Sequence, residues 1–195
     1  MDRRRNGQIS ASPKEPHLIF IKNQHPHADI SPYSPLRGRN QYFYIMSTYK
    51  KILYQIVFGS KYGHPFLNPK NETTLYNYMA GTIRNKNSVP YIIGGHANHV
   101  HIISSLHPSV ALADLVKDIK ISSNLMMKEE PCLFDSFREW QSGYGAFTYH
   151  IDIKNNLLNY VKNQKEHHQQ VTFVEELIAY FEEFGIEYDK RYLLD

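Results

Sequence analysis

Cysteine is almost absent from this chain of 195 residues, which contains only Cys132. A single thiol cannot close an intrachain disulfide, and it cannot form the cysteine cluster of a structural zinc site. No run of residues is apolar and uncharged for long enough to cross a bilayer, and the residues that follow Met1 lack the apolar core of a secretory signal. The sequence therefore argues against a disulfide scaffold and a helical membrane protein, and it predicts a cytoplasmic location.

Basic side chains outnumber acidic ones along most of the chain. Residues 1–45 have seven basic and three acidic side chains, and residues 46–165 have thirteen and eight, which gives net charges of +4 and +5. Residues 166–195 reverse the balance with two basic and eight acidic side chains, or −6. A mildly basic central region is compatible with binding to a phosphate backbone, although the same balance occurs in proteins that bind no nucleic acid.

Few signals of regular structure occur in residues 1–45. Prolines recur there among Ser, Asn, His and Arg side chains, and only residues 17–22 have the composition of a strand. A segment of this kind buries too little apolar surface to offset the entropy lost on ordering, so we expect a poorly structured N-terminal extension. Residues 46–195 are the predicted folded domain.

The predicted domain alternates between strand and helix signals. Runs of β-branched and aromatic residues predict four strands, at residues 52–58, 89–94, 98–104 and 146–150. Apolar residues at helical spacing predict four helices, at residues 72–86, 109–128, 152–168 and 172–184. Ser109 and Asp152 are the expected N-caps of the second and third helices, and Gly185 is expected to end the fourth.

The order of these elements predicts the fold class. It is β-α-β-β-α-β followed by two C-terminal helices, which is the ferredoxin-like (RRM-like) α+β arrangement with an antiparallel four-stranded sheet. Because this fold supports many functions, the function has to be argued from individual residues.

His99 and His101 are the first candidates for chemistry. Side chains alternate along a strand, so these two imidazoles are expected on one face and Val100 on the other. A neutral imidazole is a common metal ligand, and the pair could share one cation. A second His-x-His sequence, His25-Pro26-His27, lies in the extension with no strand to orient it, so the spacing alone is a weak signal.

Tyr160 and Gln164 are the second pair of candidates. Residues four apart share a helix face, so the two side chains are expected to project together. A tyrosine can act as a covalent nucleophile on a phosphate, although its ordinary pKa of about 10 makes it weak without help. The amide oxygen of Gln164 is a hard ligand, which suits Mg²⁺ or Mn²⁺ better than zinc. Judged by its position alone, in a chain with 15 tyrosines, Tyr160 is better explained as a tyrosine that packs at the edge of the core.

Three sequence blocks in this order resemble the insertion sequence 200-like transposases, including the REP-associated tyrosine transposases. They are HVHII at residues 99–103, WQSGYGAFTY at residues 140–149 and LLNYVKNQKEHH at residues 157–168. Members belong to the single-tyrosine HUH class of nucleases, in which two histidines flank a bulky hydrophobic residue. The resemblance extends over residues 46–195 and includes the terminal EYDKRYLLD, which makes it far more specific than any single motif.

The resemblance implies a role for each matching residue. His99, His101 and Gln164 would hold a divalent metal, Mg²⁺ or Mn²⁺, and Tyr160 would be the nucleophile. The residue before the first histidine is often Asp in such proteins and is Asn98 here. Asn98 keeps an acceptor oxygen but loses the charge, so its support of the metal ligand is expected to be weaker.

The resemblance also implies a reaction and its partners. We expect a DNA transposase that cuts and rejoins single-stranded DNA through a 5′-phosphotyrosine intermediate and a free 3′-OH. Relatives often recognise a hairpin, and they act as homodimers in which the tyrosine helix of one subunit can complete the histidine pair of the other.

Weaker candidates lie outside this set. Lys117 and Lys120 could contact DNA phosphates, although a solvated helix face is the simpler interpretation. Trp140 could stack on a base, although a packing role is the simpler one. His167 and His168 follow the tyrosine and are interpreted as surface residues, and His96 is left outside the site.

Three alternatives from other classes stay open. A single-stranded nucleic-acid-binding module would place aromatic residues on the sheet surface, whereas the third strand offers His, Val, His, Ile and Ile. A non-catalytic or domesticated regulatory relative would retain the fold without the reaction. A small metal-dependent hydrolase would use the histidine pair and leave Tyr160 without a role.

Overall fold

The computed structural model describes residues 51–195. The predicted extension, the His-Pro-His sequence within it and the predicted boundary between residues 45 and 46 all lie outside the described residues. Within residues 51–195, no helix is both long enough and apolar enough to span a membrane.

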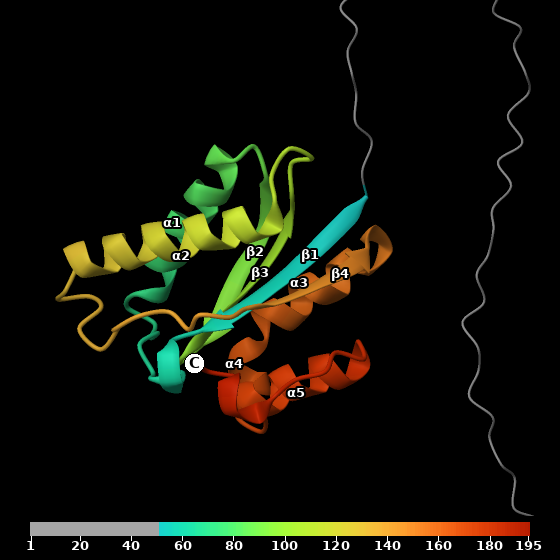
Figure 1. Cartoon of the computed structure of the whole chain (residues 1–195). Helices are drawn as coiled ribbons and strands as arrows, with labels where there is room; N and C mark the ends of the chain where they lie inside the picture. The colour runs from blue at the N-terminus through green and yellow to red at the C-terminus, as the bar shows by residue number, and fades with distance from the viewer. Residues whose placement is uncertain (1–50) are drawn as a thin grey trace, which may run out of the picture. The chain divides into compact units, whose positions relative to one another are not determined.

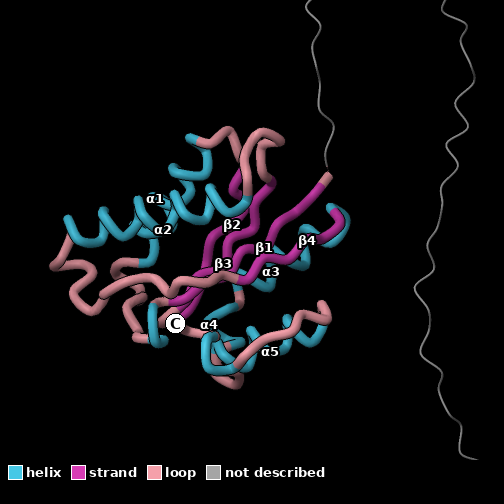
Figure 2. The backbone as a smooth tube through the Cα atoms, viewed as in Figure 1, coloured by secondary structure: helices cyan, strands magenta, loops and turns pink. Residues whose placement is uncertain are grey.

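Four antiparallel strands form one sheet in the order β2-β3-β1-β4 (Figures 1 and 2). The strands are β1 (Ile52–Gly59), β2 (Val89–His96), β3 (His99–Ser105) and β4 (Gly145–His150). The helices are α1 (Glu72–Asn85), α2 (Leu112–Glu129), α3 (Lys154–Lys162), α4 (Gln164–His167) and α5 (Phe173–Glu183). This topology confirms the predicted ferredoxin-like α+β fold.

Both faces of the sheet are covered by helices. Alternate residues of the central strands β1 and β3 point to opposite faces, so each strand contributes to two cores. On one face, Ile56, Phe58, Val100 and Ile102 pack with α1 and α2 in the largest apolar cluster. The opposite face meets α3 and α5 (Figure 1). His99 and His101 lie on that second face, because they alternate with Val100 and Ile102.

Helix α2 begins three residues later than predicted. Its N-cap is Ala111, which has no side-chain capping bond. The expected cap, Ser109, instead has its hydroxyl 2.7 Å from Nδ1 of His107. The competing local hydrogen bond keeps Ser109 in the loop before the helix.

The predicted third helix is divided into two. A 3-10 turn covers Ile151–Ile153, α3 covers Lys154–Lys162, and Asn163 separates α3 from α4 with φ −94° and ψ 14°. Asp152 does not cap α3, whose N-cap position is Ile153. The break changes the path of the chain between Tyr160 and Gln164, so these residues do not share one continuous helix as expected.

Helix α5 begins and ends where the sequence predicts. Thr172 and Glu175 form a capping box, in which the Glu175 amide donates to the Thr172 hydroxyl and the Thr172 amide donates to the Glu175 carboxylate. Gly185 follows the last turn with φ 63°, a conformation that glycine adopts without strain. The two signals fix the residues that α5 presents to the sheet.

The close packing of α3 against β2 depends on Gly94. A Cβ at this position would lie 2.8 Å from Cγ1 and 2.9 Å from the carbonyl oxygen of Val161. We therefore expect Gly94→Ala to push α3 away from the sheet and to lower the free energy of unfolding by about 1–3 kcal/mol. Urea or thermal denaturation measures the change.

Gly81→Ala is the matched control, because Gly81 lies inside α1 and a Cβ there meets no atom within 4 Å. Removal of a helix-interior glycine should raise stability by about 0.5–1 kcal/mol. Equal effects of the two substitutions would contradict the packing argument.

Candidate active site

His99 and His101 are placed side by side at the start of β3. Both are fully buried, and their ring centroids are 5.1 Å apart. Val100 points the other way and is buried in the α1–α2 core. The alternation predicted from the sequence is therefore confirmed.

Asn98 orients His99. Its side-chain oxygen lies 2.9 Å from Nδ1 of His99, and its side-chain nitrogen donates to the carbonyl of Gly63 at 3.1 Å. The second bond identifies which end of the amide faces His99, so Nδ1 of His99 carries the proton and donates it. The lone pair of Nε2 then faces the interior of the site. A hydrogen bond of this kind at Nδ1 fixes the tautomer and the ring orientation that a metal-binding histidine needs.

His101 has a comparable partner in Gln55. The side-chain amide of Gln55 lies 3.4 Å from Nδ1 of His101 and 2.7 Å from the hydroxyl of Tyr180. As placed, the nitrogen of Gln55 faces both atoms. Because the two ends of an amide have the same shape, turning it over would bring its oxygen to Nδ1 as a hydrogen-bond acceptor. On its other side, Nε2 of His101 is 3.2 Å from the Glu176 carboxylate.

Tyr160 and Gln164 lie against the same carboxylate. The Tyr160 hydroxyl donates to Oε1 of Glu176, and the Tyr160 ring centroid is 5.9 Å from that of His101. Gln164 is buried, donates to Oε1 of Glu176 at 3.1 Å and has its own oxygen 3.4 Å from Nε2 of His99. The structure thus brings the four predicted site residues together despite the helix break.

His168 and Glu176 are the site residues that the sequence analysis missed. The side chain of His168 is only 3% exposed and its Nε2 is 3.4 Å from Oε2 of Glu176, so its assignment to the surface is wrong. His167 remains a third exposed. The ring of His96, which was left outside the site, stacks on His168 with centroids 5.6 Å apart.

The position of Glu176 in α5 was the available signal. It lies between Phe173 and Leu177, and all three side chains are buried. A carboxylate at helical spacing within an apolar stripe is unusual unless it is paired. The pattern shows that Glu176 is buried, but it does not show which groups it meets.

The charges of the site are strongly coupled. Burial lowers the pKa of His99 well below its ordinary value, and the neighbouring His101 lowers it further. Burial alone would raise the pKa of Glu176, but the imidazoles of His101 and His168 beside it and the hydrogen bond from Tyr160 hold it well below its usual range. Burial, together with the charge of Glu176, raises the pKa of Tyr160. At neutral pH the carboxylate is therefore ionised and the phenol keeps its proton.

Four of these side chains could hold a metal ion. One ligand atom from each of His99, His101, His168 and Glu176 lies within 4.8 Å of the others. Neutral imidazole nitrogens and a carboxylate are metal ligands, so the donor set fits a divalent cation. The amide oxygen of Gln164 borders the same space.

Beside Tyr160 lies a mostly apolar cavity of about 350 Å³, lined by residues that include Gln55, Tyr149, Glu176 and Tyr180. Burial raises the pKa of Tyr149 to about 12. The cavity gives the Tyr160 side chain an open side that the buried histidines lack.

Comparison with known proteins identifies the family. The family profile described as "Transposase IS200 like" matches residues 48–164, which is more than half of the chain. The chain belongs to the IS200-like transposase family. This membership confirms the resemblance seen in the three sequence blocks. No curated protein matches the chain.

Two solved structures are similar to this IS200-like transposase. A candidate transposase from Deinococcus radiodurans R1 is 19% identical, with a TM-score of 0.48 over 67% of this chain and 98% of that one. A REP-associated tyrosine transposase bound to a REP hairpin is 14% identical, with a TM-score of 0.45 over 65% of this chain and 76% of that one.

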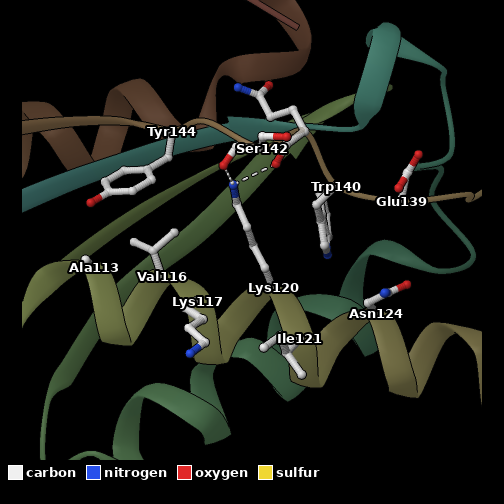
Figure 3. A pocket seen from close by; sticks show the side chains of 11 residues that line it. Ala113, Val116, Lys117, Lys120, Ile121, Asn124, Glu139, Trp140, Ser142 and Tyr144 are labelled. Atoms are coloured by element: carbon white, nitrogen blue, oxygen red, sulfur yellow. Dashed lines mark hydrogen bonds between the residues drawn. The ribbon is translucent and has the colours of Figure 1, made fainter. Parts of the chain in front are cut away.

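The remaining predicted site residues are Lys117, Lys120 and Trp140. They lie on the α1–α2 side of the sheet, around a cavity of about 350 Å³ (Figure 3). Trp140 is buried, packs edge-on against Phe58 and donates its N–H to Ser123 at 3.0 Å. These contacts give it a packing role, so its ring is not a platform for a base. Lys117 is exposed on α2 and points away from the 141–143 loop (Figure 3).

Lys120 holds the loop before β4 in place through three hydrogen bonds. Its ammonium donates to the carbonyls of Gln141, Ser142 and Gly143 at 2.9, 3.2 and 2.6 Å. Burial lowers the pKa of Lys120 to about 8. Contact with DNA stays a prediction for Lys117 and would require Lys120 to leave these carbonyls.

We expect Lys120→Met to lower the free energy of unfolding by about 1–2 kcal/mol, because the three carbonyls lose their donor. Lys117→Met is the control on the same helix and should change stability by less than about 0.5 kcal/mol. Denaturant titration of both variants measures the difference, and a Lys120→Met variant as stable as the wild type would show that the loop does not need this ammonium.

Proposed function

We propose that this transposase cuts and rejoins single-stranded DNA by tyrosine transesterification, with Tyr160 as nucleophile and a divalent metal held by His99, His101 and Gln164. One observation carries the proposal. The hydroxyl of Tyr160 and Nε2 of His101 both meet the carboxylate of Glu176, on its two oxygens. A nucleophile and a metal-ligand pair are therefore separated by the width of one small anionic group.

A scissile phosphate is also a small anionic group with two free oxygens. In the proposed reaction, the Tyr160 oxygen forms a bond to phosphorus and the bond from phosphorus to the 3′ oxygen breaks. The products are a 5′-phosphotyrosine and a strand whose leaving 3′ oxygen takes up a proton from solvent and so ends in a 3′-OH. Attack by this or another 3′-OH reverses the step and rejoins DNA. The phosphodiester energy is conserved in the covalent link, so no nucleotide cofactor is consumed.

Neighbouring side chains provide an acceptor for the proton of Tyr160 and hold the site around it in place. Its phenol has a raised pKa, so its proton has to be transferred as the oxygen attacks. Glu176 already accepts that proton in a hydrogen bond, and Gln164 donates to the same carboxylate oxygen. Asn98 and Gln55 hold the two imidazoles in place. A bound divalent metal would supply charge neutralisation at the phosphate oxygens.

The proposed substrate is single-stranded DNA, because a splayed strand exposes its phosphates and bases. A hairpin at the ends of the element is the proposed recognition feature, consistent with the family. The homodimer remains a prediction; in this structure Tyr160 and the histidine pair meet within one chain.

The decisive variant for this proposal is Tyr160→Phe. Wild-type protein with labelled single strands from the flanks of its own gene, and with Mg²⁺ or Mn²⁺, should give a covalent protein–DNA band on a denaturing gel. Tyr160→Phe should reduce the band to background, because the nucleophilic oxygen is gone. Tyr78→Phe is the control, since Tyr78 is 40% exposed on α1, on the other side of the sheet.

Other outcomes identify the alternatives. Strand cleavage that survives Tyr160→Phe would indicate a hydrolase that uses the histidine pair with water. DNA binding without a covalent band on any flanking strand would indicate a non-catalytic relative.

His101→Asn tests the metal half of the proposal. It should abolish the covalent band, as a chelator should in the wild-type protein, while DNA binding measured by anisotropy stays within about threefold. Each imidazole that holds the ion contributes charge neutralisation worth several kcal/mol at the transition state. A covalent band that persists in chelator would contradict metal dependence.

A further inference from the structure

Three imidazoles of the site have one nitrogen anchored and the other directed inward. Nδ1 of His99 faces Asn98 at 2.9 Å, and Nδ1 of His168 faces the carbonyl of Val171 at 2.7 Å. Nδ1 of His101 faces the amide of Gln55 at 3.4 Å. The oxygen acceptors beside His99 and His168 place the proton on Nδ1 and leave the lone pair on Nε2, and His101 adopts the same tautomer when Gln55 turns its amide oxygen toward Nδ1.

The inward atoms face one another, with Nε2 of His101 and Nε2 of His168 lying 3.2 and 3.4 Å from Oε2 of Glu176. Among the described residues, Nε2 of His101, Nε2 of His168 and Oε2 of Glu176 are buried and form no hydrogen bond. These atoms and a nitrogen of His99 lie within 4.8 Å of one another. Lone pairs that converge in a buried space without protons to share are costly unless a cation lies between them.

We propose that His168 and Glu176 complete the metal site, so that the ion is held by three imidazoles and a carboxylate and is a transition ion such as Co²⁺ or Zn²⁺ in preference to Mg²⁺. This inference rests on the proposed function, because it takes His99 and His101 as ligands. It adds two ligands from residues 165–195, which the family profile does not cover.

The preference for a transition ion follows from the chemistry of the ligands. Mg²⁺ favours oxygen ligands and retains several waters, whereas imidazole nitrogen favours zinc, copper, iron and nickel. A set of three nitrogens and one carboxylate oxygen therefore discriminates against Mg²⁺. Gln164 donates its amide N–H to Oε1 of Glu176 and thereby orients the carboxylate, while its amide oxygen stays directed at the edge of the same space, where the proposed function places it as a ligand.

The same arrangement gives α5 a function. Glu176 offers Oε2 to the ion while its Oε1 accepts from Tyr160, so one carboxylate sets the position of the nucleophile relative to the metal. The capping box at Thr172 fixes where α5 begins, and thereby the turn on which Glu176 lies.

The test is a titration of the apo protein with Co²⁺, followed by its visible absorption, without DNA. The wild-type protein should show the intense d–d bands of a low-coordinate nitrogen–oxygen site. Glu176→Gln and His168→Gln should each weaken Co²⁺ binding by roughly 10-fold or more and shift the spectrum. His150→Gln is the control, because His150 is an exposed imidazole at the end of β4. Circular dichroism of the apo variants checks folding, and Glu176→Asp, which keeps the charge but shortens the reach, replaces Glu176→Gln if that variant does not fold.

Competition by other ions tests the second half of the inference. Zn²⁺ should displace Co²⁺ at concentrations at least 100-fold lower than Mg²⁺ does. Wild-type affinity and spectrum in both Glu176→Gln and His168→Gln would overturn the assignment of the ligands, and equal competition by Mg²⁺ would overturn the preference. Unchanged Co²⁺ binding with more covalent DNA product in Glu176→Gln would show that the carboxylate blocks the place of the phosphate, which also overturns the inference.

The two proposals fail in different experiments. Normal Co²⁺ binding with no Tyr160 adduct on any strand would remove the proposed function and leave the metal site. A Tyr160 adduct combined with Co²⁺ binding that is unchanged by Glu176→Gln and His168→Gln would disprove the two added ligands and leave the proposed function standing.

Discussion

The candidate site depends on one buried negative charge, the carboxylate of Glu176. It accepts hydrogen bonds from Tyr160 and Gln164 on one oxygen and faces His101 and His168 with the other. A carboxylate this deeply buried is stable only because these groups surround it. Removal of the carboxylate would leave the phenol without its acceptor and the inward nitrogens of His101 and His168 without the group that they face, so the geometry of nucleophile and ligands follows from this contact.

The sheet supplies the frame on which this contact is built. Strand β3 lies inside the sheet and aims two histidines at one face, while its alternate residues anchor the α1–α2 core on the other. Gly94 on the adjacent strand lets α3 approach closely enough to carry Tyr160 to the histidines. Helices α3 and α5 thus cover the same face of the sheet. Helix α3 carries Tyr160, and α5 carries Glu176, which accepts its hydrogen bond.

The sequence predicted the parts of the molecule that depend on local patterns. Strand alternation placed His99 and His101 on one face, and Gly185 marked the end of α5, because these features involve residues that are close in sequence. The sequence did not predict the break at Asn163 or the start of α2, where local hydrogen bonding and tertiary packing outweigh helical periodicity.

The partners of Glu176 could not be predicted for a different reason. Their contacts join residues 75 positions apart in the case of His101 and Glu176, and no local pattern encodes where α5 packs. For Tyr160 and Gln164, which lie within the residues that the family profile matches, the family resemblance implied a role that no local pattern could indicate. The resemblance extends to residue 195 but implied no role for Glu176, which lies beyond the residues that the family profile matches. His168 was assigned to the surface because its exposure depends on the turn that follows α4.

Peptide mapping of the covalent adduct tests the central claim most directly. Trypsin should release residues 155–162 as one peptide, NNLLNYVK, in which Tyr160 is the only tyrosine. After reaction with a single-stranded oligonucleotide and nuclease digestion, mass spectrometry should find the added nucleotide on this peptide, linked through its 5′-phosphate. Attachment to any other peptide, or linkage through a 3′-phosphate, would contradict the account.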